Sequence, residues 1–167
     1  MTHAIYLSLG SNLGDRLANL DGAVSRLVPG VEHIIPSPVY ETMPWGYSDQ
    51  PDFLNQCLAA DTSLAPLDLL ALCKDIEATM GRKETFRFGP RLIDLDILFY
   101  DNIILETPTL TIPHPRITER PFILIPLADI APELIHPVLH KTIQQLRLGM
   151  DSSSVTLYRP DQAKLEP

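Results

Sequence analysis

The spacing of hydrophobic residues in the first third of the chain predicts a strand, a helix and a second strand. Residues 4–9 have the pattern of a short strand, which ends at turn residues 10–12. Apolar residues at helical spacing predict a helix over residues 17–27, followed by a helix-ending Pro-Gly pair. Residues 31–42 are strand-like, although their two prolines favour an edge position or a bulge.

The middle of the chain repeats this alternation after a loop over residues 43–52. Residues 53–62 predict a strand, and a helix follows in which Pro66 suits the first turn and Gly81 the left-handed end. The next strand is residues 92–100. The order β-α-β-β-α-β is the split βαβ of ferredoxin-like folds. We therefore expect an α+β fold with a mainly antiparallel sheet flanked by helices.

The last third of the chain predicts C-terminal additions to this core. Residues 110–112 have the pattern of a short strand, and residues 122–130 and 142–148 are helical. Residues 151–167 are polar and predict a loose tail. The chain is thus expected to form one domain over residues 1–150.

Two carboxylates interrupt the apolar strand at residues 92–100. Because side chains alternate along a strand, Asp94 and Asp96 share one face. The opposite, core-facing set is Ile93, Leu95, Ile97 and Phe99. Groups roughly 6.6 Å apart repel by about 2.5 kcal/mol at an effective dielectric of 20. Mg²⁺ bound together with substrate phosphates would offset this repulsion, whereas two solvated side chains at a strand end are the simpler alternative.

Composition and charge narrow the possible functions. The 167 residues are 45% hydrophobic and 20% charged, which is typical of a globular domain. A net charge of −8 argues against binding to nucleic acid or to an anionic membrane. However, Arg82, Arg87 and Arg91 precede the aspartate pair, and guanidinium groups beside carboxylates suit a metal-bound nucleotide.

The compartment expected from the sequence is the cytoplasm. The first ten residues lack the charged and apolar regions of a signal peptide, and the chain contains no run of 18 apolar residues. Cys57 and Cys73 match no metal-ligand spacing and lie in apolar segments, so we expect buried free thiols.

Three further segments carry candidate chemistry. Residues 10–16 lie between a strand and a helix but lack a P-loop pattern, which favours a tight turn with Asn12 or Asp15 near the helix start. His114 is held between two prolines, a low-entropy position for a phosphate ligand, although loop histidines are usually surface residues. Trp45, Phe53 and Phe122 could stack on a flat ligand, although aromatic residues at such spacing are more often core.

Seven segments, in this order, carry a resemblance to a known family. They are "LGSNLGDR" (9–16), "YETMPWGYSDQPDFLN" (40–55), "TSLAPLDLL" (62–70), "GR" (81–82), "RFGPRLIDLDIL" (87–98), "IPHPRITERPF" (112–122) and "PLADIAPEL" (126–134). The chain closely resembles the 6-hydroxymethyl-7,8-dihydropterin pyrophosphokinase (HPPK) family. This family transfers pyrophosphate from ATP to the hydroxymethyl group of the dihydropterin in folate biosynthesis and releases AMP.

The resemblance implies a role for each matching residue. Asp94 and Asp96 would hold two Mg²⁺ ions. The nucleotide, ATP, would contact Arg82, Arg91, Ile97, Thr111, His114 and Arg120, of which Arg82, Arg91 and His114 would also serve catalysis. The pterin would contact Thr42, Trp45, Phe53, Asn55 and Phe122. A mobile loop over residues 82–89 would close over ATP, and the family is commonly monomeric.

Two alternative functions stay open from the sequence. The first is a ferredoxin-like RNA-binding or regulatory domain, against which the acidic charge and the absence of an RNA-stacking aromatic strand both count. The second is a pterin- or nucleotide-binding protein without catalysis, against which the aspartate pair counts.

Overall fold

The protein is built around one six-stranded antiparallel sheet, and the computed structural model describes residues 1–163. The strands of this sheet are β1 (His3–Ser11), β2 (Val31–Pro36), β3 (Tyr40–Thr42), β4 (Phe53–Thr62), β5 (Asp94–Tyr100) and β8 (Val155–Leu157). Their order is β5-β1-β4-β3-β8, and β2 also pairs with β4. A separate two-stranded sheet contains β6 (Leu105–Glu106) and β7 (Thr111–Ile112).

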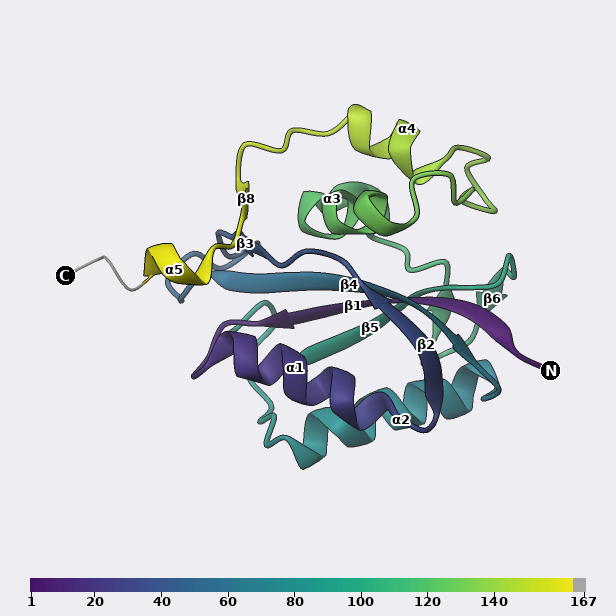
Figure 1. The fold of residues 1–167 in the computed structure, drawn as a ribbon, viewed down its shortest axis with the longest axis horizontal. Coiled ribbons are helices and arrows are strands. Elements are labelled where there is room, and N and C mark those ends of the chain that lie inside the picture. Colours follow the sequence, from purple (N-terminus) through teal and green to yellow (C-terminus); the bar gives the residue numbers. More distant parts are fainter. Residues whose placement is uncertain (164–167) are drawn as a thin grey trace.

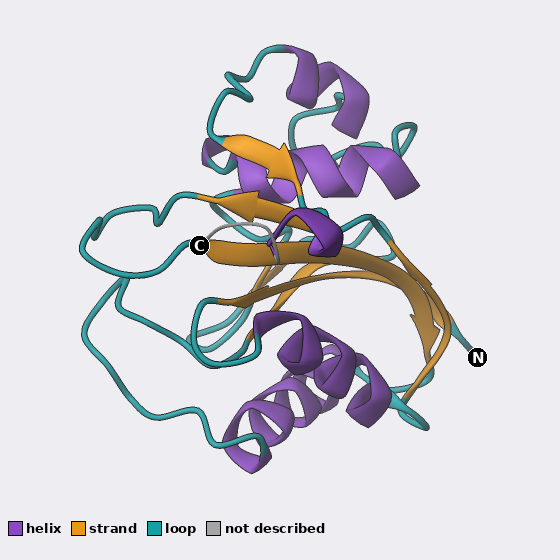
Figure 2. Cartoon of the chain, turned by 60° about the vertical axis from the view of Figure 1, so that its left-hand side comes forward, coloured by secondary structure: helices purple, strands orange, loops and turns teal. Residues whose placement is uncertain are grey.

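Helices cover both faces of the main sheet and give three layers (Figure 1). The helices α1 (Arg16–Leu27) and α2 (Pro66–Thr79) pack on one face, and α3 (Pro121–Ile130) packs on the other with α4 (Ile143–Leu148) outside it. Short helical turns form at Ile117–Glu119 and, as α5, at Pro160–Ala163. Figure 2 shows the curved sheet between the two helical layers. Within residues 1–163, no helix has the length and hydrophobicity needed to span a membrane.

Local sequence signals set the helix ends as predicted. Asp15 caps α1, because its carboxylate accepts a hydrogen bond of 3.1 Å from the N–H of Ala18. Pro66 occupies the first turn of α2, and Gly81 follows the helix with a φ of +93°. Cys57 and Cys73 are buried free thiols, which confirms their expected state.

One part of the predicted side-chain alternation along β5 is wrong. Ile93, Leu95 and Ile97 lie in the core beneath α1 and α2, as expected. Phe99 instead joins the core beneath α3. The register against β1 shifts at this point, with Leu7 opposite Ile97 but Tyr6 opposite Phe99. Such a bulge places one extra residue in β5 and turns the following side chain to the other face.

Two segments differ from the predicted pattern at the opposite edge. Residues 31–42 form two strands, because Ser37 bonds to the backbone of Cys57 through its own N–H and through its hydroxyl oxygen. The expected loose tail is wrong for part of its length, since β8 pairs with β3 and α5 follows it. Residues 164–167 of that predicted tail lie outside the described residues.

Candidate active site

The two aspartates of β5 lie at the centre of a charged cluster. Asp94 accepts a hydrogen bond of 2.9 Å from Nη1 of Arg91, and its other oxygen lies 3.4 Å from Nη1 of Arg82. Asp96 has no comparable ion pair within residues 1–163. Burial, and secondarily the negative charge of Asp94, raise the pKa of Asp96 to about 7. Asp94 is thus held by two arginines, whereas Asp96 lacks, within the described residues, a cationic partner of the kind that a bound metal ion would supply.

A buried glutamate on α2 supports this cluster from behind. Glu77 has a side chain only 4% exposed, and its Oε2 lies 2.5 Å from Nη1 of Arg82 and 3.2 Å from Nζ of Lys74. Its Oε1 accepts a hydrogen bond of 2.9 Å from the N–H of Leu95, between the two aspartates. Glu77 therefore fixes both the arginine and the backbone of the aspartate-bearing strand.

His114 lies beside β5 in a defined orientation. Its backbone N–H donates to the carbonyl of Leu98, and its ring Nδ1 accepts a hydrogen bond of 3.1 Å from the backbone N–H of Arg116. Burial and the positive charge of Arg120 lower the pKa of His114 to about 4, so the imidazole is neutral near pH 7. Because Nδ1 is an acceptor, the ring proton is on Nε2, which is available to a ligand.

Arg120 is half-buried, and its hydrogen-bonding capacity is only partly used. Its Nε has no hydrogen-bond partner within residues 1–163, and burial lowers the pKa of its guanidinium. Its guanidinium carbon lies 5.4 Å from the ring centre of Trp45 and 5.7 Å from that of Phe122. A desolvated cation with an unpaired N–H suits an anionic ligand.

The larger cavity, of about 340 Å³, contains the residues predicted to bind pterin. Its lining includes Thr42, Trp45, Phe53, Asn55 and Phe122, together with Asp94, Asp96, Arg91 and Arg120. The amide of Asn55 donates a 2.7 Å hydrogen bond to the hydroxyl of Thr42, so its carbonyl is held in place on the cavity wall. The arrangement offers flat apolar faces and a few fixed polar groups, as small-molecule sites do.

A second cavity, of about 260 Å³, lies beyond the aspartates. Ile97, Thr111 and His114 line it, as does Lys74 from α2. Asp96 belongs to the lining of both cavities. The residues predicted for the pterin line the larger cavity, whereas those predicted for the nucleotide are divided between the two. Ile97, Thr111 and His114 line the second cavity, Arg91 and Arg120 line the larger one, and Arg82 lines neither.

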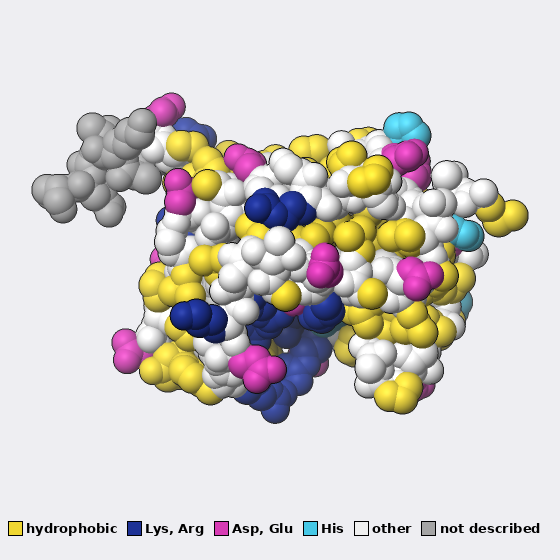
Figure 3. Space-filling model, turned by 90° about the horizontal axis from the view of Figure 1, so that it is seen from below, with side chains coloured by type: hydrophobic (Ala, Val, Ile, Leu, Met, Phe, Trp, Pro, Cys, Tyr) yellow, Lys and Arg dark blue, Asp and Glu magenta, His cyan; other side chains and the backbone are white. Residues whose placement is uncertain are grey.

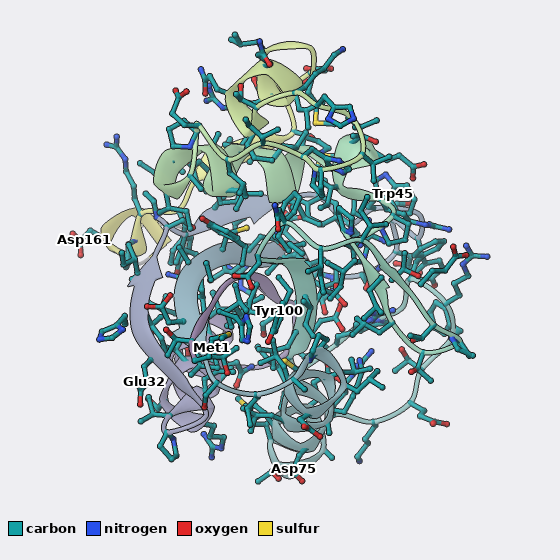
Figure 4. The ribbon with its side chains drawn as sticks, turned by 90° about the vertical axis from the view of Figure 1, so that its right-hand side faces the viewer. Met1, Glu32, Trp45, Asp75, Tyr100 and Asp161 are labelled. Carbon is teal, nitrogen blue, oxygen red and sulfur yellow. The ribbon has the colours of Figure 1, made fainter. Side chains whose placement is uncertain are left out.

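Basic side chains gather locally despite the net negative charge. Figure 3 shows Lys and Arg side chains around a hollow on one face of the molecule. Trp45 lies among the loops on the flank opposite α5 and β2 (Figure 4). The local concentration of positive charge fits a small anionic ligand better than an extended polyanion.

The family is decided by comparison with known proteins. A family model for 7,8-dihydro-6-hydroxymethylpterin-pyrophosphokinase (HPPK) matches residues 6–132. The chain belongs to this family. The resemblance found in the sequence is thereby confirmed.

Relatives of the HPPK family differ in length. A 2-amino-4-hydroxy-6-hydroxymethyldihydropteridine pyrophosphokinase of Methylorubrum extorquens is 44% identical over 157 residues, covering 93% of this chain and 98% of that protein. The corresponding protein of Aquifex aeolicus is 43% identical, covering 86% of this chain and 89% of that one. The folic acid synthesis protein fol1 of Schizosaccharomyces pombe is 43% identical over 92% of this chain. This chain spans only 21% of that relative's length, and 22% of its Dictyostelium discoideum counterpart.

Solved structures of HPPK-containing proteins share the fold. An HPPK-DHPS crystal structure in complex with substrates matches with a TM-score of 0.72 at 19% identity, covering 89% of this chain and 43% of that chain. Plasmodium falciparum HPPK-DHPS gives a TM-score of 0.72 at 23% identity, with 89% and 44% coverage. At this identity the match supports the fold, a mixture of helices and antiparallel sheet.

Several residues at the site were missed in the sequence. Glu77 lies four residues after Cys73 on the buried stripe of α2. A charged residue on such an apolar stripe is unusual, so the helical spacing alone could have indicated it. Lys74 lines the second cavity but has no distinguishing local pattern, whereas Arg116, which lines the larger cavity, belongs to the proline-bounded loop that the sequence already indicated through His114. Arg82, which the HPPK resemblance assigns to ATP, is bound here to Glu77 and Asp94.

Proposed function

We propose that this chain transfers pyrophosphate from ATP to 6-hydroxymethyl-7,8-dihydropterin, giving the pterin diphosphate and AMP in folate biosynthesis. In this reaction the hydroxymethyl oxygen bonds to the β-phosphorus of ATP. The bond from that phosphorus to the oxygen bridging it to the α-phosphate breaks, and the hydroxyl proton is released. The observation that carries the proposal is the meeting of two cavities at Asp96, among cations suited to phosphates. Membership of the HPPK family supports it.

We propose that Asp94 and Asp96 hold two Mg²⁺ ions together with the phosphates. Residues 1–163 contain no group of three or more His, Cys, Asp or Glu side chains arranged as a metal cage. Mg²⁺ does not require one, because it is commonly bound by one or two carboxylates, substrate phosphates and water. Burial and the negative charge of Asp94 raise the pKa of Asp96, and a cation bound directly to both carboxylates would offset these effects. Bound Mg²⁺ would neutralise phosphate charge during the transfer.

The side chains of the protein would orient the two substrates for in-line transfer. The guanidinium groups of Arg91 and Arg120 border the larger cavity, where they would bind phosphate oxygens. The Nε2–H of neutral His114 would donate to a phosphate oxygen from the second cavity. On the pterin side, Asn55 would form hydrogen bonds with the polar edge of the ring, while Phe53 and Phe122 would stack on its faces. Such positioning can lower the barrier without a covalent intermediate.

The finer description of the fold is also a proposal. The antiparallel order β5-β1-β4, with β2 and β3 together as the fourth strand position, supports the ferredoxin-like arrangement. In this scheme α1 and α2 are the two crossover helices, and α3, α4 and β8 are additions. From the family resemblance we further propose a monomeric, cytoplasmic enzyme.

The decisive experiment separates the nucleotide products. Purified protein is incubated with ATP, Mg²⁺ and 6-hydroxymethyl-7,8-dihydropterin, and the nucleotides are resolved by chromatography. Pterin-dependent AMP is the expected product, whereas ADP would indicate phosphoryl transfer and refute the proposed reaction. Folded protein that binds pterin without any nucleotide turnover would instead indicate a non-catalytic binding protein.

Two variants connect this activity to the aspartate pair. Asp96→Asn should lower turnover by at least about a thousandfold, because it removes one carboxylate from the proposed metal site. Asp75→Asn is the matched control, since Asp75 is an exposed aspartate on α2 that lies outside both cavities. Near wild-type turnover in Asp96→Asn would remove the metal assignment.

A further inference from the structure

One nitrogen of Arg16 connects the two strands that carry residues proposed to bind pterin. Arg16 begins α1, and its Nη1 lies 2.6 Å from Oε2 of Glu41 and donates a hydrogen bond of 3.0 Å to the carbonyl of Asp52. Glu41 precedes Thr42 in β3, and Asp52 precedes Phe53, the first residue of β4. Each contact of Arg16 is therefore made one residue before a residue proposed to bind pterin.

The contacts of Arg16 act on the cavity wall from its outer side. Thr42 lies opposite Phe53 in the register of β3 and β4, and both line the larger cavity together with Asn55. Because successive side chains of a strand point to opposite faces, Glu41 points away from the cavity, towards Arg16. Arg16 thus holds the ends of both strands from behind the wall that the pterin would contact.

The orientation of the Asn55 amide depends on the position of β3. Its Nδ2 donates a hydrogen bond of 2.7 Å to the hydroxyl of Thr42, and both side chains are buried. The amide therefore presents its oxygen, an acceptor, to a ligand. The polar edge of a pterin carries N–H donors at N3 and at the 2-amino group. A shift of β3 would release the amide and weaken the selection of this edge.

The C-terminal strand β8 covers the other side of β3 and pairs with all three of its residues (Figure 1). The hydroxyl of Thr156 donates a hydrogen bond of 3.3 Å to the carbonyl of Glu41, and the N–H of Tyr158 donates to the carbonyl of Val39 at 2.9 Å. The ring centre of Tyr158 also lies 5.8 Å from the guanidinium carbon of Arg16. Because β3 is so short, its position depends on these partners.

We infer that Arg16 and β8 form a brace that positions Thr42 and Asn55 for recognition of the pterin edge. Arg16 is a positioning residue, since it lines neither cavity. The residues proposed to bind ATP lie on other segments, so the affinity for ATP should not depend on the brace. The inference rests on the proposed function for the identity of the ligand.

Variants of Arg16 test the first half of the brace. Arg16→Met removes the charge and retains a long side chain, and the loss of an ion pair this accessible to solvent leaves the chain folded. Arg16→Lys is the conservative variant, because both contacts come from one nitrogen and a lysine ammonium can replace it. Arg26→Met is the matched control, since Arg26 is exposed in the last turn of the same helix.

Variants of Thr156 test the second half. A proline within so short a strand should disrupt the pairing of β8 with β3, so Thr156→Pro removes this support in the full chain. Thr156→Val is the control at the same position, because it keeps the backbone N–H and loses only the hydroxyl.

The experiment measures binding without turnover. Calorimetry gives the dissociation constant of α,β-methylene ATP with Mg²⁺ and, on protein saturated with this analogue, those of 6-hydroxymethyl-7,8-dihydropterin and its 2-deamino analogue. In Arg16→Met and Thr156→Pro the dissociation constant of the pterin should rise about tenfold, while the ATP analogue binds within about twofold of wild type. Arg16→Lys and the two controls should bind the pterin within about threefold of wild type.

Selectivity separates positioning from a general loss of stability. The wild type should prefer the pterin over its 2-deamino analogue, because Oδ1 of Asn55 accepts from the polar edge. In Arg16→Met and Thr156→Pro this preference should fall by at least about threefold. A general destabilisation would instead weaken the binding of both compounds equally.

Two results would overturn the inference, once circular dichroism and a urea midpoint show that a variant is folded. The first is binding of the pterin by Arg16→Met or Thr156→Pro within about twofold of wild type. The second is an unchanged preference over the 2-deamino analogue. A wild type that binds pterin with this preference but produces no AMP would refute the proposed function and leave the inference standing.

Discussion

Replacing Glu77 should lower the free energy of unfolding through two contributions that two different substitutions can separate. Its carboxylate is almost fully buried, binds Arg82 and Lys74 through one oxygen and accepts the N–H of Leu95 with the other. Glu77→Gln removes the charge but retains an oxygen that can accept from Leu95. Glu77→Leu removes both the charge and the acceptor.

The expected magnitudes follow from these contacts. Opposite charges 4 Å apart attract by about 4 kcal/mol at an effective dielectric of 20. Two contacts limit the loss in Glu77→Gln: Arg82 keeps Asp94 at 3.4 Å, and the side chain of Lys74 is 53% exposed and can be solvated. About half of that attraction should therefore be lost, which costs about 2 kcal/mol. The unsatisfied N–H of Leu95 adds about 2 kcal/mol in Glu77→Leu, for a total of about 4 kcal/mol.

Urea unfolding monitored by far-ultraviolet circular dichroism measures both free energies of unfolding. The exposed Glu133 provides the control Glu133→Gln, which should stay within about 0.5 kcal/mol of wild type. If Glu77→Gln is equally harmless, the buried ion pair contributes nothing to stability. If Glu77→Leu costs no more than Glu77→Gln, the hydrogen bond to Leu95 is unimportant. Either result would refute the reasoning.

Three further predictions concern pH, ligand binding and metal. His114 has a folded-state pKa of about 4, below its ordinary 6.5, so only the unfolded chain gains the proton between these values. The contribution of His114 to the free energy of unfolding should therefore fall by at most about 3 kcal/mol as pH drops from 6.5 to 4, while the raised pKa of Asp96 contributes in the opposite direction. The difference between wild type and His114→Gln in urea unfolding isolates this contribution; a difference that does not change with pH contradicts the assignment. Phe53→Ala should weaken pterin binding about tenfold in a fluorescence titration but leave the ATP analogue within about twofold; equal losses would contradict the separation of the two cavities. Chelation of Mg²⁺ by EDTA should abolish AMP formation and excess Mg²⁺ should restore it, whereas turnover that persists in EDTA would refute metal dependence.

The parts of the fold with strong local periodicity could be predicted from the sequence. The strand over residues 53–62 was predicted with its observed bounds, and α1 and α2 differ from their predictions by at most a residue at the ends. The strand Val155–Leu157 could not be predicted, because three residues define no alternation and its partner β3 is more than a hundred residues away. The placement of Phe99 on the other face of the sheet likewise depends on a bulge against β1 that no local pattern reveals.

The site was predictable where a residue type is unusual for its surroundings. Asp94 and Asp96 interrupt an apolar strand, and His114 lies between prolines, so each was found from its neighbours. Asn12 was interpreted as a turn residue, because its bonds to Gln50 and Arg91 join segments about 40 and 80 residues away. Polar bridges of this kind are set by tertiary structure, and the local sequence contains no sign of them.

The position of β5 at the end of the sheet gives its aspartates a second consequence. An apolar edge strand has unpaired backbone groups that can recruit a strand from another molecule, and charged side chains on it discourage such pairing. The N–H of His114 occupies the carbonyl of Leu98, while Asp94 and Asp96 place charge along the preceding part of the strand. Variants that lose both carboxylates would present a nearly continuous apolar edge. Asp94, whose side chain stays partly exposed, would thus discourage the pairing of β5 with a strand of another molecule in addition to its role in the proposed chemistry.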